Sequence, residues 1–555
     1  MKCRLPNMVL ASLAILVVFS GCSSDDPLPP DVAPPRRSSS KVDLFELAWD
    51  NFDHLGEHEP DEPLPETIAR LNQWIRSEPP MQPWKPDPLV AALPVGLLAT
   101  PLMQRLGSTT FVESDGPFLH EAILMRQTSQ FIVGDETDPL RKAELLFDWT
   151  MRNIQLDPNS TRLWPRESLL LGRAAPLDRE WVFLSLARQQ GLDVVWLAIP
   201  RNEENTQFSP WCPALFHNGE LYPFDLLWGS PVPTADGQGV AALSEIVDND
   251  DLLRQLDVSG KFYPYTADAL QEVAALIAAR EPFLSRRMRI VQERLDARNE
   301  NHGLVLHVAP SELASKVEEL SGVLTAQLWL WPFEYAIRRE SGSDESKAMR
   351  REIATRMLPF RVRHIVRTEA RQEGEFEQPV TETTIWPLWA GRLHHLAGRF
   401  ERRSEQDVAT QSRDEFQSQL DEKAGPARLS AAIPFYLIAR TKIQELDDPP
   451  DEPLSEAQLQ ELKQVGILLR RMELDASYWL GLIRSQQGDE TTAADFFQRS
   501  IDLTKNRTAA APFRYNLGRA WESLGKHDQA IEQYRQERSP GSLLRIKRLE
   551  SRKEP

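Results

Sequence analysis

The residue best suited to nucleophilic chemistry is Cys212, one of three cysteines in the chain. The other two, Cys3 and Cys22, lie near the amino terminus, so no framework of intramolecular disulfides is expected. A catalytic thiol needs a neighbouring base or positive charge. His217 is the nearest histidine in sequence, but strand alternation would put it on the opposite face from Cys212. We therefore expect Cys212 to be a buried structural residue, unless the fold brings His120 within hydrogen-bond reach of it.

Two histidines four residues apart, His54 and His58, stand among acidic residues and could form a metal site on a helix face. A zinc site needs a third ligand and a closed shell, so a solvated acidic segment is the simpler interpretation. The adjacent residues His394 and His395 point in different directions on a helix, which favours surface or packing roles. No metal and no cofactor is expected, because the chain also lacks a GxGxxG motif and a Walker-type phosphate loop.

Two further clusters have a chemical and a structural interpretation. Four aromatic residues could floor a sugar groove, but their alternation favours a core strand: Trp329, Trp331, Phe333 and Tyr335. Three arginines alternate with apolar residues and indicate a solvated helix face: Arg286, Arg287 and Arg289.

The elements that position Cys212 have the clearest secondary-structure signals in the chain. We expect a helix over 139–154, a helix over about 178–190 that Asp178 caps, a strand over 192–199, and a hairpin of strands 214–217 and 220–225. A two-residue Asn218-Gly219 turn would pair His217 with Glu220. Counting outward, Cys212 would then face Asp225, a carboxylate that disfavours the thiolate.

The order helix, helix, strand, hairpin over residues 139–225 resembles the transglutaminase-like superfamily, which has a papain-like α+β fold. That family places a nucleophilic cysteine at the amino end of a helix, a histidine base on the following strand and an orienting aspartate on the next strand. The resemblance implies that Pro176, Cys212 and Asp225 occupy these three positions. Only the aspartate is kept, so the resemblance implies a pseudo-enzyme in which no residue is confidently catalytic.

The first residues have the pattern of a targeting signal. Residues 1–21 combine a charged start with an apolar run that is too short to span a bilayer, which predicts a signal peptide. The segment Phe19-Ser20-Gly21-Cys22 resembles a bacterial lipobox. It implies acylation of Cys22, as with palmitate, and Ser23 then favours the outer membrane, facing the periplasm. Residues 22–41 are rich in Pro and Ser and predict an extended tether.

Residues 391–555 have helical patterns, interrupted by a Pro-rich break over 447–453. Two units align at a spacing of 37 residues: Leu480-Gly481, Gly488, Ala493 and Phe497 match Leu517-Gly518, Gly525, Ala530 and Tyr534. Small residues would let two helices touch while an aromatic ring fills the gap. The pattern over about 474–541 resembles tetratricopeptide repeats, which implies a protein-binding surface. A plain helical hairpin is the alternative, and the segment from His395 to Phe400 could open an earlier unit.

The rest of the chain divides into two less distinct segments. Residues 42–136 form a mixed segment with a helix near 65–75, and residues 261–390 predict a second α/β module. In that module we expect helices over 262–300 and 310–320, and strands over 302–308 and 324–333.

Length and charge set the limits of these interpretations. A chain of 555 residues should contain several domains, and its formal net charge of −18 makes nucleic acid an unexpected partner. We expect an α+β protein with a degenerate transglutaminase-like domain over 137–260, the α/β module and an all-α tetratricopeptide-like region. Its expected function is that of a lipid-anchored scaffold with a protein partner. The alternatives are a cysteine-dependent acyl transferase or peptidase using Cys212, and glycan binding without catalysis.

Overall fold

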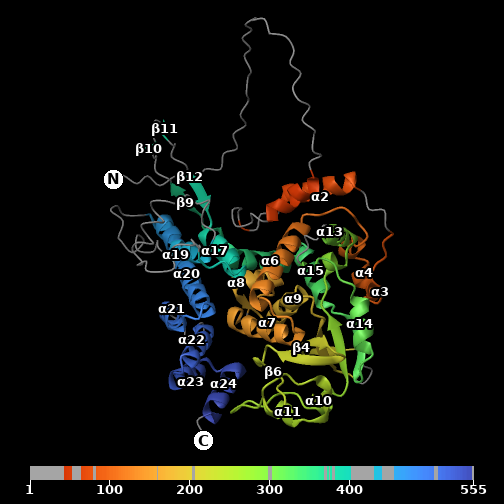
Figure 1. Cartoon of the computed structure of the whole chain (residues 1–555). Helices are drawn as coiled ribbons and strands as arrows, with labels where there is room; N and C mark the ends of the chain where they lie inside the picture. The colour runs from red at the N-terminus through yellow and green to blue at the C-terminus, as the bar shows by residue number, and fades with distance from the viewer. Residues whose placement is uncertain are drawn as a thin grey trace, which may run out of the picture. The chain divides into compact units, whose positions relative to one another are not determined.

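The computed structural model describes residues 43–52, 60, 64–78, 83–158, 160–202, 207–297, 303–367, 372–373, 376–377, 382–401, 431–440, 455–504 and 510–552. The predicted signal peptide, the tether and Cys22 lie outside these residues. Leu44 to Pro555 form one compact unit. Its fold is α+β, as predicted (Figure 1).

A six-stranded mixed sheet has the strand order β6-β5-β4-β3-β7-β8. Its strands are β3 (Val194–Pro200), β4 (Phe208–His217), β5 (Glu220–Asp225), β6 (Ser230–Pro231), β7 (Val273–Ile277) and β8 (Val323–Leu328). Neighbouring strands are antiparallel, except that β7 and β8 are parallel. Asn218 and Gly219 have φ values of 52° and 77°, as a type I′ turn requires, so the predicted hairpin is confirmed.

Helices α7 (Pro139–Asn153) and α9 (Pro176–Arg188) confirm the two helices predicted before the hairpin. The Asp138 side chain caps α7 by accepting the Arg141 N–H at 2.7 Å. Helices α6 (Asp115–Val133) and α8 (Pro165–Leu171) also pack on α9. Because α6, α7 and α8 surround it, α9 is buried on nearly every side.

Residues 261–390 do not form the separate α/β module that was predicted. Strand β7 pairs with β3, and β8 pairs with β7, so both extend the sheet of the preceding segment. The helix expected over 262–300 is wrong in its first part, because residues 273–277 form β7 and α13 begins at Arg286. A short apolar run such as Val-Ala-Ala-Leu-Ile has no distinguishing period, so sequence alone does not separate strand from helix there.

Two other strand predictions in this segment are wrong. No strand occupies 303–308 in the described chain, where Val305 and Leu306 donate their N–H groups to the side-chain oxygens of Gln189 and Gln292 at 3.0 and 2.7 Å. The strand expected over 324–333 ends at Leu328, and α15 (Trp331–Glu340) follows it. Proline in the first turn favours that helix start. Helix α14 (Pro310–Glu318) is as predicted.

Most of the remaining elements outside the C-terminal region are short. They are α1 (Leu44–Trp49), η1 (Asp50–Phe52), α2 (Pro65–Ser77), α3 (Pro88–Ala91), α4 (Val95–Leu98), α5 (Pro101–Gln104), β1 (Gln155–Leu156), β2 (Arg173–Ala174), α10 (Leu243–Asp248), α11 (Asp251–Arg254), η3 (Asp268–Leu270), α12 (Glu281–Leu284), α13 (Arg286–Ala297), α16 (Asp344–Met357), η4 (Leu358–Arg361), β9 (His364–Arg367), β10 (Gln372–Glu373), β11 (Phe376–Glu377) and β12 (Glu382–Ile385). Helix α2 confirms the helix expected near 65–75, and it shares a core with α1, α6 and α13.

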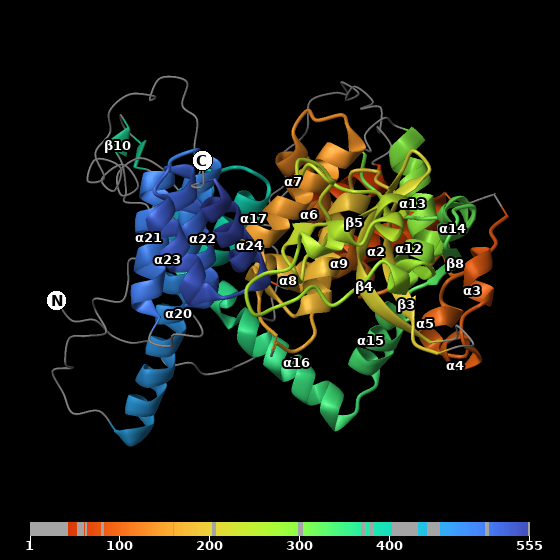
Figure 2. The ribbon, with the colours of Figure 1, turned by 90° about the horizontal axis from the view of Figure 1, so that it is seen from below.

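The described C-terminal part is helical, as predicted. It contains α17 (Pro387–Leu396), α19 (Ala432–Arg440), α20 (Glu456–Gln486), α21 (Glu490–Leu503), α22 (Ala511–Ser523), α23 (His527–Glu537) and α24 (Pro540–Ser551). From α19 onward, each helix packs on the next. Figure 2 shows α20 to α24 grouped together. The predicted break at 447–453 lies outside the described residues.

Glycines allow close contact within the helix pairs of this region. A Cβ on Gly481 would lie 2.6 Å from the Phe497 ring, and a Cβ on Gly518 would lie 2.5 Å from the Tyr534 ring. The expectation that an aromatic ring fills the space left by each glycine is therefore confirmed. In the earlier pair, α17 and α19, it is Gly391 that approaches a ring, that of Tyr436.

The largest hydrophobic core crosses the predicted domain boundaries. It joins Phe183 of α9, Trp329 before α15, Trp389 of α17, Trp479 of α20 and Leu517 of α22. Segments on both sides of the boundaries at 260/261 and 390/391 therefore contribute to one core.

Candidate functional site

The three positions to which the resemblance points, Pro176, Cys212 and Asp225, lie on α9, β4 and β5. Pro176 is the first residue of α9, and residues 174–177 contain no thiol. The hairpin register pairs His217 with Glu220 and continues to Ala214 opposite Pro223. The paired residues end there, two positions short of Cys212 and Asp225, but the Asp225 carboxyl lies close enough to Cys212 to raise the pKa of its thiol.

Cys212 is completely buried. Burial raises the pKa of its thiol well above the ordinary range, and the carboxyl groups of Asp225 and Glu180 raise it further. A backbone hydrogen bond from Phe224 opposes this effect only in part. At neutral pH the side chain is therefore a protonated thiol, which is a poor nucleophile.

The structure brings neither candidate histidine to Cys212. His217 is five positions along the same strand and therefore on the opposite face of the sheet. His120 lies on α6, where its ring packs at 5.7 Å from that of Trp389. Burial and the neighbouring Arg166 lower its pKa, and its Nε2 atom has no hydrogen-bond partner. The condition under which His120 could serve as a base is not met.

Asp225 belongs to a buried chain of hydrogen bonds. Trp211 Nε1 donates to Tyr263 Oη at 2.8 Å, and Tyr263 Oη donates to Asp225 Oδ2 at 2.9 Å. The N–H of Trp228 donates to the other carboxylate oxygen at 2.6 Å. Burial nevertheless raises the pKa of Asp225 to about 6. All its partners are donors that hold the carboxylate in place, and none is a histidine that it could orient.

Glu180 is a site residue that the sequence did not single out. It lies four residues after Pro176 on α9, is 3% exposed, and one of its carboxylate oxygens has no hydrogen-bond partner. Burial and Asp225 raise its pKa well above the ordinary range. Glu180 follows Asp178 and Arg179 directly, and a run of three charged residues gives no sequence signal that this one is buried.

Asp178 does not cap α9, contrary to expectation. The helix begins two residues earlier, at Pro176, and the N-cap residue before it, Ala175, makes no side-chain hydrogen bond to the helix. The Asp178 carboxylate instead accepts the N–H of Leu163 at 3.0 Å and pairs with Arg162 at 3.2 Å. Burial raises its pKa to about 6.

The other candidate clusters have structural roles. Of the arginines expected on a solvated face, Arg287 is completely buried and binds Asp115 and Glu281 through charged hydrogen bonds of 2.8–2.9 Å. That expectation is therefore wrong for this residue, because two carboxylates compensate its charge. The aromatic residues from Trp329 to Tyr335 do not alternate on a strand, since α15 begins at Trp331.

The histidine candidates do not form a metal site in the described chain. His395 is buried, and its Nδ1 lies 3.2 Å from Tyr436 Oη, whereas His394 stacks on Phe435. His54 and His58 lie outside the described residues. Within the described ranges, His, Cys, Asp and Glu side chains nowhere gather in a group of three that could hold a metal ion.

One face of α20 and α22 is covered by the chain itself. Tyr478 Oη and Asn516 Nδ2 donate to the backbone carbonyl of Arg152 at 3.0 and 2.8 Å. Arg173 pairs with Asp475 at 3.0 Å. These contacts attach the C-terminal helices to α7 and β2.

None of the helices in the described part of the chain combines the length and the apolar character that crossing a bilayer requires. The chain matches no protein-family model, and comparisons with curated proteins and with solved structures give no significant match either.

Proposed function

We propose that the chain is a lipid-anchored protein of the bacterial cell envelope, with an inactive transglutaminase-like region and tetratricopeptide-like repeats, and that it acts as a protein-interaction scaffold. The observation that carries the proposal is the environment of Cys212. Its thiol is buried, faces a carboxyl group and has no histidine as a hydrogen-bond partner. A catalytic thiol needs the opposite environment.

The arrangement of α9, β4 and β5 supports the proposed relation to the transglutaminase-like fold. The helix start, the first strand and the second strand of the hairpin follow the order of that family, and they carry Pro176, Cys212 and Asp225. Proline has no nucleophilic side chain, and Asp225 has no histidine to orient. The scaffold would thus retain a fold without its chemistry.

The proposed partner surface is on the C-terminal helices. The contacts of Gly481 with Phe497 and of Gly518 with Tyr534 support a repeat architecture. Since α20 and α22 already bind α7 and β2, we assign the partner to the sides of α21 and α23 that point away from α20 and α22. The partner would be a protein, because the net charge of −18 opposes binding of nucleic acid.

Complementation distinguishes the scaffold from the alternative enzyme using Cys212. A strain that lacks the protein is supplied with the full-length chain, unchanged or carrying Cys212→Ala. Both chains should correct the defect of that strain equally well, because the thiol takes part in no reaction. A folded Cys212→Ala variant that fails to restore the phenotype would favour the cysteine-dependent acyl transferase or peptidase.

Lipid attachment has a matched control within the same chain. Labelled palmitate supplied to cells should be incorporated into the full-length protein and into Cys3→Ala, but not into Cys22→Ala. Incorporation into all three proteins would contradict acylation at Cys22.

A further inference from the structure

Helices α15 and α16 form a pair that projects from the rest of the compact unit (Figure 2). The buried residues of α16 are confined to one narrow side of the helix: Ser346, Ile353 and Met357. Its other residues are half-buried or exposed. Much of the surface of α16 is therefore open to solvent in the described chain.

One exposed face of α16 is basic. At 3.6 residues per turn, its members fall within an arc of about 100° around the helix axis. They are all exposed, and we call them the basic face: Lys347, Arg350, Arg351, Ala354 and Leu358. Leu358 continues the helical conformation after the last residue of α16 and is 43% exposed. No acidic residue of α16 falls within this arc.

The charges of the basic face are poorly compensated. Arg350 donates to the backbone carbonyl of Arg339, and the side chain of Arg351 has no partner in the described chain. Lys347 pairs with Asp344 at 3.2 Å, but both side chains are more than half exposed. Such an exposed ion pair contributes little free energy, so its lysine remains available to another anionic group.

The other acidic residues of α16 lie away from the basic face. Glu345 and Glu352 share a different side of the helix, where Glu352 binds Arg356 at 2.9 Å. Within α16, the one acidic residue that borders the basic face is therefore Asp344.

This region differs in charge from the rest of the chain. Residues 338–363 contain eight basic and four acidic residues, whereas acidic residues outnumber basic ones by 82 to 64 overall. Interactions between exposed charges fall off over about 8 Å at physiological ionic strength. A surface that approaches α16 therefore meets the local positive charge rather than the net charge of −18.

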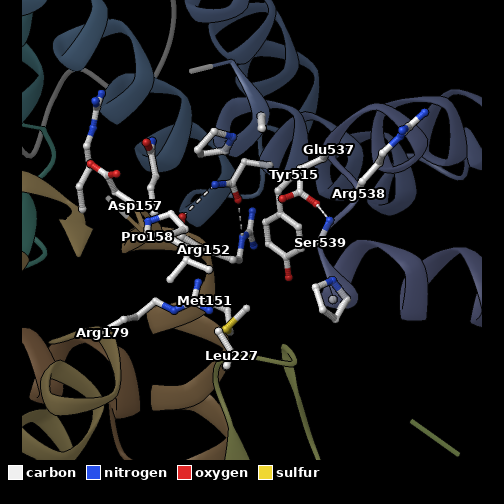
Figure 3. A pocket seen from close by; sticks show the side chains of 18 of the residues that line it. Met151, Arg152, Asp157, Pro158, Arg179, Leu227, Tyr515, Glu537, Arg538 and Ser539 are labelled. Atoms are coloured by element: carbon white, nitrogen blue, oxygen red, sulfur yellow. Dashed lines mark hydrogen bonds between the residues drawn. The ribbon is translucent and has the colours of Figure 1, made fainter. Parts of the chain in front are cut away.

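The arginines around a cavity of about 530 Å³ between α7, α9 and the C-terminal helices provide a contrast (Figure 3). Burial lowers the pKa of Arg179 in this lining, and three carboxyl groups act in the opposite direction: Glu180, Glu537 and Asp225. Arg173 of the same lining pairs with Asp475 at 3.0 Å. These charges are compensated within the protein, unlike those of Arg350 and Arg351.

We propose that the basic face of α16 lies on a membrane surface that contains anionic phospholipids. Lys347, Arg350 and Arg351 would bind the phosphate groups of the lipids. Leu358 would enter the boundary between headgroups and acyl chains. A basic helix face with an exposed apolar residue is typical of binding to a membrane surface.

A membrane is favoured over an acidic protein by the proposed lipid anchor, so this inference rests on the proposed function. The residues from Cys22 to Val42 can span at most about 75 Å, even when fully extended. An acylated Cys22 would therefore keep α16 close to the bilayer. At the high effective concentration of lipid that results, a few basic residues suffice for a contact.

Co-sedimentation with lipid vesicles tests the inference. The chain from Lys41 onward is used, because it contains the whole compact unit Leu44–Pro555 and lacks Cys22. At low ionic strength it should bind vesicles of equal parts phosphatidylcholine and phosphatidylglycerol about tenfold or more tightly than vesicles of phosphatidylcholine alone. Added salt should weaken this binding, because it screens the charges.

Two triple variants separate the basic face from the overall charge. The first neutralises the basic face and should weaken binding to the anionic vesicles by about tenfold or more: Lys347→Gln, Arg350→Gln and Arg351→Gln. The second removes the same charge from exposed positions of α7, α14 and α23 and should bind as the unchanged chain does: Arg141→Gln, Lys316→Gln and Arg535→Gln. Circular dichroism should show that both variants are folded, because all six side chains are exposed.

The inference is overturned if the chain binds neither kind of vesicle or both equally, if the basic-face variant binds as tightly as the unchanged chain, or if the control variant loses as much binding. Binding of poly-glutamate in place of vesicles would indicate an acidic protein partner and would also overturn it. Because the tested chain lacks Cys22, these outcomes are separate from palmitate incorporation, which tests the anchor itself.

Discussion

At the scale of residues, α9 and β5 carry buried carboxyl groups, and two of them, Asp225 and Glu180, act on Cys212. Asp178 and Asp225 both have pKa values raised to about 6, and that of Glu180 is raised as well, in each case first by burial. A carboxylate beside a thiol favours the neutral, protonated thiol over the negatively charged thiolate. The same feature makes the stability of the protein depend on pH.

Asp225→Asn should flatten the dependence of stability on pH. Because the pKa of Asp225 rises from 3.8 to about 6 on folding, the folded state binds this proton more tightly than the unfolded state does. Its contribution to stability is therefore complete below about pH 4 and is lost as the pH rises to about 6, by about 3 kcal/mol. Urea unfolding at several pH values should show a smaller fall over this range in Asp225→Asn than in the unchanged chain. An equal fall in the free energy of unfolding of the two proteins would contradict this prediction. The control is Asp251→Asn, a substitution of an exposed aspartate, which should leave the fall unchanged.

The sequence predicted part of this site and missed the rest for a physical reason. The Asn218-Gly219 turn fixes a local register, so the proximity of Cys212 to Asp225 could be predicted by counting along the hairpin. The hydrogen bond from Tyr263 joins residues 38 positions apart, and no local pattern encodes it. The same holds for Glu180, whose burial depends on three helices packing around α9.

At the scale of elements, the C-terminal helix pairs depend on glycine where two helices meet. The repeat spacing of 37 residues predicted that these glycines allow close helix contact and that aromatic rings fill the space beside them. The strand β7 was missed, because five apolar residues have no period that separates strand from helix.

Gly481→Ala should destabilise the protein by about 1–3 kcal/mol, because the added Cβ would lie 2.6 Å from the Phe497 ring. Gly466→Ala, in the same helix, is the matched control: its Cβ would meet no atom within 4 Å, so better helix propensity should stabilise it by up to about 1 kcal/mol. Denaturant unfolding measures both changes. Equal effects of the two substitutions would contradict the close contact, and Phe497→Leu should partly rescue Gly481→Ala.

At the scale of the whole molecule, one core and a set of polar contacts join the sheet to the C-terminal helices. The core includes Phe183, Trp389 and Leu517, and Asn516 donates to the backbone of Arg152 at 2.8 Å. Sequence patterns indicate where elements begin and end, but such long-range contacts depend on the packed structure. The expectation of a separate module over 261–390 failed for this reason.

Asn516→Ala should therefore weaken the whole compact unit. Asn516 is 1% exposed, and its loss leaves the partly buried carbonyl of Arg152 and the buried hydroxyl of Tyr478 with one partner fewer each, at a cost of about 1–3 kcal/mol. Unfolding followed by far-UV circular dichroism and by tryptophan fluorescence should show one common midpoint, shifted downward in the variant. Two separate transitions would contradict a shared core.

The central claim, that Cys212 is not a nucleophile, is tested most directly by its alkylation rate. The chain from Lys41 onward keeps Cys212 as its single thiol, so every modification by iodoacetamide belongs to it. We predict slow labelling across the range from about pH 6 to 9, accelerated only by unfolding, because burial and the Asp225 carboxyl keep the thiol protonated. A fast rate that reaches its plateau below about pH 7 would reveal an activated thiolate and contradict the inactive assignment.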